Sequence, residues 1–146
     1  MTVSNFLTNI TAALTNSRRT NPLIIDISSH QRVNWDIVAP HIDGVIARCS
    51  WQVYKDVTFL PAVEECAKRG IPIEAYHGWS PNFTNEQQMS VIRSQLSGTG
   101  IPRIWNDVEV WKDAAGGTIA GATISSRAQA FTLPQHPVGG AGCQSG

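Results

Sequence analysis

Two carboxylates stand two residues apart within an apolar, Trp-flanked run. Asp107 and Glu109 lie in segment 104–111, IWNDVEVW, which follows the chain breakers Gly100 and Pro102. A run so rich in Ile, Val and Trp predicts a buried strand. Alternate side chains of a strand share one face, which places the two carboxylates about 6.6 Å apart along it. Burying two like charges costs stability, so the pair indicates a function, the alternative being an exposed edge strand with solvated acids.

This spacing suits acid–base chemistry. The negative charge of Asp107 is expected to raise the pKa of Glu109 by like-charge repulsion. A carboxyl group that keeps its proton near neutral pH can act as a general acid. The two acids therefore form the first candidate site, and the elements that position them come next.

Segment 104–111 is the last of four predicted strands, which alternate with helices. The strands are predicted at residues 23–28, 44–50, 71–77 and 104–111, and the helices between them at 35–39, 59–69 and 85–96. This alternation predicts an α/β fold in which parallel β/α repeats form a sheet. A closed eight-stranded barrel takes at least about 200 residues. Since this chain has only 146 residues, we expect the amino-terminal half of a TIM-like barrel.

Parallel strands place their functional residues at their carboxyl ends. Polar candidates lie at or near the ends of all four predicted strands: Asp26, Ser50, Tyr76, His77, Asp107 and Glu109. We expect these side chains to converge on one rim of the sheet.

Aromatic residues near the strand ends are candidates for ligand stacking. Trp79 and Trp111 lie just past predicted strands, where their rings could stack on sugars. Trp35 and Trp105 are instead expected in the core. Cys49 and Cys66 are expected as small buried apolar residues rather than as a disulfide.

The composition favours a neutral ligand. The chain has 146 residues, a formal net charge of zero, 15% charged residues and five Trp. Such a balance gives no electrostatic footprint for nucleic acid or for an anionic membrane. Few charges and many Trp residues fit a ligand that is held by stacking and hydrogen bonds, as sugars are.

The two ends of the sequence are predicted to lie outside the sheet. We expect an N-terminal helical arm at residues 1–20, a β/α domain at 21–131 that ends in a helical segment from 124, and a disordered tail at 132–146. The sequence shows neither a membrane-spanning run nor a secretory signal, so synthesis in the cytoplasm is expected.

Five motifs in order resemble the glycoside hydrolase family 25 lysozymes, which are N-acetylmuramidases. They are IDISSHQ at 25–31, IARCS at 46–50, Asp56 with Phe59, GIPIEAYH at 70–77, and DVE at 107–109. The resemblance covers roughly residues 22–131. It implies a modified β/α barrel, truncated here after the fourth strand, that needs no cofactor.

The resemblance also implies an activity, namely cleavage of the β-1,4 bond between N-acetylmuramic acid and N-acetylglucosamine in the glycan strands of peptidoglycan, with the cell wall as site of action. Glu109 matches the general acid/base, Asp107 the second carboxylate, and Asp26 the acid of the first strand.

The sequence also departs from the family pattern. It has no counterpart of the acid near the family's last strand. The run Trp51-Gln52-Val53 replaces a glycine that is usual after the second strand, and Glu74 stands where a small residue is common.

The spacing of the carboxylates bears on mechanism. Carboxylates at this spacing leave little room for the water that an inverting enzyme must admit. They are also poorly oriented for direct nucleophilic attack on the anomeric carbon. We therefore expect Asp107 to orient the 2-acetamido group of the substrate, which attacks the anomeric carbon. Asp26 either stabilises positive charge in the site or pairs with Arg48.

Three more residues are candidates for substrate binding. Tyr76 and His77 are placed to hydrogen-bond the sugar, although His77 has a structural role as its alternative. Arg48 either binds a lactyl carboxylate or neutralises the acids.

Two other functional classes stay open. Asp26, His30, His77 and Asp107 are potential ligands of a metal-dependent hydrolase, but their spacing matches no metal motif. An inactive fragment or a glycan-binding module is the other alternative. Four parallel strands alone leave an open sheet edge, through which self-association is expected.

Overall fold

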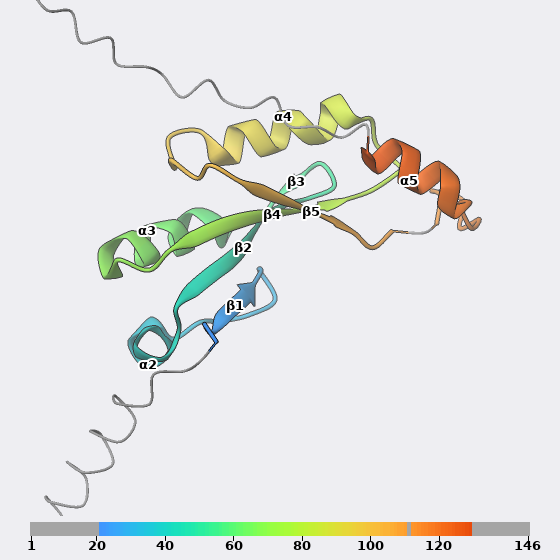
Figure 1. Cartoon of the computed structure of the whole chain (residues 1–146). Helices are drawn as coiled ribbons and strands as arrows, with labels where there is room; N and C mark the ends of the chain where they lie inside the picture. Colours follow the sequence, from blue (N-terminus) through green and yellow to red (C-terminus); the bar gives the residue numbers. More distant parts are fainter. Residues whose placement is uncertain (1–20, 111, 130–146) are drawn as a thin grey trace, which may run out of the picture.

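The computed structural model describes residues 21–110 and 112–129. At its centre is a five-stranded sheet in which β1, β2, β4 and β5 are parallel neighbours in that order, while the short β3 pairs antiparallel with β2 (Figure 1). The expected N-terminal arm, the tail, Trp111 and Cys143 lie outside the described residues.

Helices alternate with the parallel strands. The strands are β1 (Ile24–Ile27), β2 (Gly44–Trp51), β3 (Tyr54–Lys55), β4 (Ile73–Trp79) and β5 (Ile104–Val108). The helices are α2 (Trp35–Val38), the 3-10 turn η1 (Ala39–His41), α3 (Phe59–Arg69), α4 (Asn85–Leu96) and α5 (Gly121–Gln129). The predicted α/β fold with a parallel sheet is confirmed.

The bounds of α3 and α4 follow from local chemistry and agree with the prediction. α3 ends at Gly70, whose φ of 66° lies in the left-handed region that glycine adopts without steric cost. α4 begins after Thr84, whose hydroxyl accepts a hydrogen bond from the Gln87 backbone N–H while the Gln87 side chain bonds back to Thr84. These caps fix where the chain leaves α3 and where it enters α4.

Strand β3 was not predicted. After β2 the chain turns back through Gln52, which has a φ of 56°, and the next residues pair with the end of β2. Gln52 belongs to the run that replaces a glycine in the family pattern. A positive φ is uncommon for a residue other than glycine, so the residue types did not predict this turn.

The hydrophobic core lies on one face of the sheet. Val45, Ala47 and Cys49 alternate along β2 and are buried together with residues of α3 and α4. Cys49 and Cys66 are both buried and free, as expected. Burial raises the pKa of each thiol to about 11, so both stay protonated. Helices α3 and α4 therefore cover the same face of the sheet.

The opposite face is uncovered in the described part of the chain. Ile24 of β1 and Trp105 of β5 are 51% and 52% exposed. The prediction that Trp105 belongs to the core is therefore wrong, and its indole N–H instead donates to Glu74. The prediction of a buried strand at 104–111 is also wrong, because β5 ends at Val108 and lies at an edge of the sheet, as in the alternative of an exposed edge strand.

Other structural expectations fare differently. Trp35 packs against the core as predicted. No described helix has the length and apolar character needed to cross a membrane. Self-association through a sheet edge stays a prediction.

Candidate functional site

Four predicted site residues lie on the uncovered face, one from each parallel strand. They are Asp26, Arg48, Tyr76 and Asp107, called here the open-face cluster. Along each strand the side chains alternate between the two faces. Ile27, Ala47 and Ala75 belong to the core under the helices. Their chain neighbours Asp26, Arg48 and Tyr76 therefore project from the other face of the sheet.

The strand register brings the open-face cluster together. Arg48 lies opposite Tyr76 in the β2–β4 ladder, and Asp107 lies opposite Gly78 in the β4–β5 ladder. Asp26 lies opposite Ile46, two residues before Arg48. The cluster therefore runs diagonally across all four strands toward their carboxyl ends. Of the side chains predicted to converge there, Asp26, Tyr76 and Asp107 share this face, whereas Ser50 and His77 are buried on the other.

The charges of the open-face cluster influence one another. Burial, followed by the charges of Glu109 and Asp26, raises the pKa of Asp107, while Arg48 opposes the rise. Burial also raises the pKa of Tyr76 to about 12, with contributions from the charges of Asp26 and Asp107 and from a hydrogen bond to Asp26. Tyr76 therefore keeps its proton and can donate a hydrogen bond at neutral pH.

The two central carboxylates differ in environment. Asp107 is half-buried within β5, whereas Glu109 is exposed and follows the last residue of the strand. The expectation that both acids lie within one buried strand is therefore wrong. The structure instead places one acid on the sheet and the other just beyond it.

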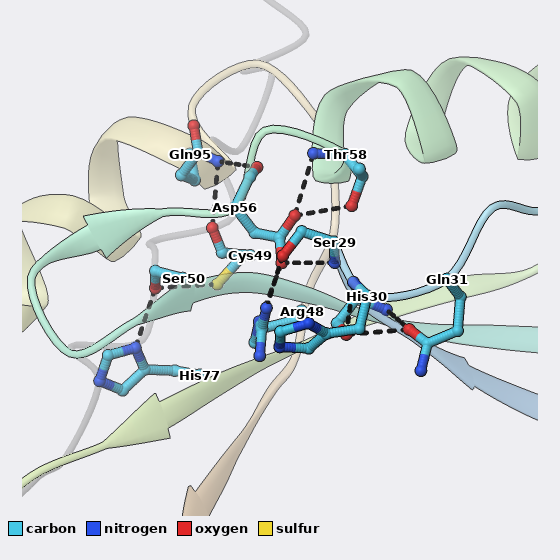
Figure 2. A network of polar contacts seen from close by, with 11 residues as sticks. Ser29, His30, Gln31, Arg48, Cys49, Ser50, Asp56, Thr58, His77 and Gln95 are labelled. Atoms are coloured by element: carbon cyan, nitrogen blue, oxygen red, sulfur yellow. Dashed lines mark hydrogen bonds and ion pairs between the residues drawn. The ribbon is translucent and has the colours of Figure 1, made fainter.

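Arg48 does not pair with Asp26. Its Nε donates to Asp56 Oδ2 at 2.8 Å, and its Nη2 donates to Ser29 Oγ at 2.8 Å (Figure 2). The side chains of Arg48 and Asp56 are 12% and 0% exposed. Arg48 thus neutralises a buried acid, and two of its nitrogens are already committed.

Asp56 lies at the centre of a hydrogen-bond network, although the sequence predicted no separate role for it. Its Oδ2 also accepts from the Ser29 N–H, and its Oδ1 accepts from the N–H and hydroxyl of Thr58 (Figure 2). Burial raises the pKa of Asp56, but the hydrogen bonds from Thr58, Ser29 and Arg48 outweigh it and hold that pKa below its ordinary value. An Asp two residues before a Thr at a helix start is a turn signal that could have identified it.

His77 lies on the helix-covered face and is fully buried. Its Nδ1 is 2.8 Å from Ser50 Oγ, and its Nε2 is 3.1 Å from Gln88 Oε1. Burial lowers the pKa of His77 to about 4, despite hydrogen bonds with Gln88 and Ser50. The predicted sugar contact by His77 is therefore wrong, and the structural alternative holds.

Trp79 also points toward the helices. Its side chain is 0% exposed and its Nε1 donates to Asn85 Oδ1 at 3.3 Å. A ring with no accessible face cannot stack on a sugar, so the predicted stacking role of Trp79 is wrong. Trp111 lies outside the described residues, and its role stays a prediction.

The proposed metal-binding set does not assemble. His77 is buried under α4, whereas Asp26 and Asp107 lie on the uncovered face. His30 is exposed in the turn after β1. In residues 21–110 and 112–129 no group of three or more His, Cys, Asp or Glu residues is arranged to hold a metal ion.

The open-face cluster contributes to neither of two hollows on the described part of the chain. These hollows, of about 430 and 550 Å³, are lined by other residues, one next to α2 and α3 and the other at the start of α4.

Comparison with known proteins identifies the fold. No family model and no curated protein matches the sequence. Solved structures do match. GHIP, a glycosyl hydrolase 25 of Streptococcus pneumoniae, aligns over 86% of this chain and 57% of its own with a TM-score of 0.63 at 20% identity. The family GH25 lysozyme of Aspergillus fumigatus aligns over 73% of this chain and 55% of its own, with a TM-score of 0.58 at 20% identity.

The fold is that of part of a family 25 lysozyme. The modular autolysin LytC of S. pneumoniae, solved in complex with a synthetic peptidoglycan ligand, also matches, with a TM-score of 0.54 at 22% identity over 75% of this chain and 29% of its own. This chain therefore spans about half the length of the first two proteins and less than a third of LytC. The family resemblance seen in the sequence is confirmed at the level of the fold.

Removing the buried carboxylate should destabilise this lysozyme-like fold. Asp56→Asn leaves Arg48 buried without a counter-ion, and breaking such a pair costs about 3 kcal/mol in free energy of unfolding. Because the folded pKa of Asp56 lies below its ordinary 3.8, the ionised group stabilises the fold above that pH, and this contribution is lost as the pH falls through the folded pKa. Urea denaturation between pH 7 and pH 2 measures both effects.

The control for this variant is Glu86→Gln, which removes an exposed ion pair with Arg93. It should change stability by less than about 1 kcal/mol. Equal losses in the two variants would contradict the structural role of Asp56.

The buried histidine predicts a second pH dependence. His77 is neutral in the folded state, whereas the unfolded chain binds a proton below its ordinary pKa of 6.5. Stability should therefore fall by about 3 kcal/mol as the pH drops from 6.5 to 4. His77→Gln should remove this slope and His30→Gln, at an exposed position, should keep it. A His77→Gln protein with the parental slope in urea denaturation would exclude this origin.

Proposed function

We propose that the chain is a lysozyme-like glycoside hydrolase that cleaves the β-1,4 bond between N-acetylmuramic acid and N-acetylglucosamine in peptidoglycan. The supporting observation is that acidic and hydrogen-bonding residues from four parallel strands share the uncovered face, near their carboxyl ends, within a family 25 fold. Active residues of β/α barrels occupy that end of the strands.

In this proposal Glu109 is the general acid/base. It is exposed and follows β5 directly, so it can reach the leaving oxygen of a bound glycan. Its proton passes to that oxygen as the glycosidic bond breaks, and Glu109 later takes a proton from the attacking water. These two transfers return the enzyme to its starting state.

Asp107 assists from the sheet. Its carboxylate accepts the N–H of the 2-acetamido group, and the acetamido oxygen then attacks the anomeric carbon. Asp26 adds negative charge next to the developing positive charge, and the Tyr76 hydroxyl donates to Asp26 or to the sugar. A pKa of Tyr76 near 12 keeps this donor protonated.

The proposed partner is the glycan strand of peptidoglycan. LytC, which shares the fold, was solved with a synthetic peptidoglycan ligand. The zero net charge and the low content of charged residues suit a neutral polysaccharide. We propose synthesis in the cytoplasm and action at the cell wall.

A glycan-binding module without activity is the second candidate. One observation favours it: the chain spans about half of GHIP, and its carboxylates lie on a face that no described element covers. Water competes with substrate contacts on such a face, which weakens electrostatic stabilisation of a transition state.

Clearing of a peptidoglycan suspension separates the two candidates. Wild-type protein should clear the suspension, and Glu109→Gln should reduce the rate by about 100-fold or more, because it removes the general acid. Glu74→Gln is the matched control, since Glu74 lies on the same face but pairs with Trp105 and Arg103, and it should clear at the wild-type rate. Cooperatively folded wild-type protein that does not clear peptidoglycan would leave only the binding module.

The stereochemical outcome tests the role of Asp107. Substrate-assisted attack inverts the anomeric carbon twice, so methanol in place of water should give the methyl glycoside with retained β configuration. NMR of the products from peptidoglycan fragments distinguishes the anomers. The α-anomer would contradict this mechanism and indicate a directly activated nucleophile instead.

A further inference from the structure

Trp51 occupies a position that only a glycine neighbour allows. It is the last residue of β2 and lies opposite Gly78 of β4. A β-carbon at position 78 would stand 1.9 Å from Cε3 and 2.4 Å from Cζ3 of the Trp51 indole. Real β-carbons do not approach other atoms this closely. The indole therefore lies directly on the bare backbone of Gly78.

The ring lies on the uncovered face of the sheet. Ser50, the preceding residue, is buried on the helix side and contacts His77, so Trp51 projects the opposite way. The partner of Gly78 on the next strand is Asp107, and neighbouring strands are about 4.8 Å apart. The indole is thus next to the carboxylate that the proposed mechanism uses.

Arg48 also contacts the ring. Its guanidinium carbon is 5.8 Å from the centroid of the Trp51 ring, within the range of a cation–π contact. The same guanidinium is fixed by Asp56 and Ser29. Since Asp56 and Ser29 position Arg48, and the β2–β4 ladder positions the backbone of Gly78, the partly exposed indole is pre-organised and loses little freedom on binding a ligand.

We propose that Trp51 is the aromatic platform of this site, and that its indole stacks on the C–H face of an N-acetylhexosamine ring and holds that ring against Asp107. The inference rests on the proposed function and adds the residue that selects a flat, neutral pyranose. It also gives Trp51 the stacking role that the sequence assigned to Trp79, whose ring is buried.

The test measures sugar binding separately from hydrolysis. The trisaccharide N,N′,N″-triacetylchitotriose is titrated into Glu109→Gln protein, in which the ligand is not cleaved, and the indole N–H signals are followed by NMR. The Trp51 signal should shift strongly, and it is assigned by its loss in Trp51→Phe. A Trp51 signal that does not move at saturating or millimolar trisaccharide overturns the proposal.

Variants in the same background give the second readout. Trp51→Ala should weaken binding by about tenfold or more, whereas Trp51→Phe, which keeps an aromatic face, should stay within about threefold of the parent. Gly78→Ala should also weaken binding, because the added methyl displaces the indole without removing it. Trp105→Ala is the matched control, since Trp105 is the more exposed ring of that face, and it should bind like the parent.

The outcomes separate this inference from the proposed function. Unchanged affinity in both Trp51→Ala and Gly78→Ala overturns the platform, even where wild-type protein clears peptidoglycan. Binding that depends on Trp51 without any clearing supports the platform and removes the hydrolase. If Trp51→Ala does not fold, the Trp51 signal of the parent and the Gly78→Ala affinity decide.

Discussion

The buried carboxylate of Asp56 is the interaction on which the rest of the structure depends. Its donors come from the turn after β1, from β2 and from the start of α3. Its backbone carbonyl accepts a hydrogen bond from Gln95 of α4, whose amide also binds the Cys49 carbonyl. A buried charge is tolerated only when its lone pairs are satisfied. Asp56 therefore ties three β/α units together, two through its carboxylate and the third through its backbone carbonyl, and a shift that separated the carboxylate from its donors would leave a buried charge unpaired.

The two faces of the parallel sheet have different roles, structural on the helix-covered face and chemical on the uncovered face. Side chains alternate between these faces along each strand. On the helix-covered face, His77 links Ser50 of β2 to Gln88 of α4, and the Gln88 side chain closes the chain after β4 by bonding the Ser80 backbone. On the other face, Tyr76 joins the open-face cluster. Adjacent residues of β4 thus have different roles, because His77 stabilises the fold and Tyr76 belongs to the site. Arg48, which Asp56 holds in place, in turn contacts the Trp51 ring.

Sequence reasoning succeeded where local chemistry decides the outcome. Gly70 ends α3 and Thr84 begins α4 through caps that act within a few residues, and the bounds predicted for these helices, 59–69 and 85–96, are correct. It failed where the answer depends on which face the helices cover. Tyr76 and His77 were both expected at the rim, although neighbours in a strand cannot share a face. For the same reason, Trp79 was expected at the site and Trp105 in the core, and the structure shows the reverse burial. The contact of Trp51 with Gly78, 27 positions later in the sequence, depends on a strand register that no local pattern encodes.

The commitment of Arg48 to Asp56 shapes the electrostatics of the uncovered face. Within the described residues, Asp26, Asp107 and Glu109 take part in none of the ion pairs. Their mutual repulsion contributes to the raised pKa of Asp107. Repulsion among acids is relieved by a proton or by positive charge, and an oxocarbenium-like transition state supplies such charge at the anomeric carbon. The repulsion that destabilises the ionised acids of this face therefore favours that transition state. The negative charge of these acids also disfavours an anionic ligand. A neutral sugar ring beside the Trp51 indole is thus the ligand that best fits this face.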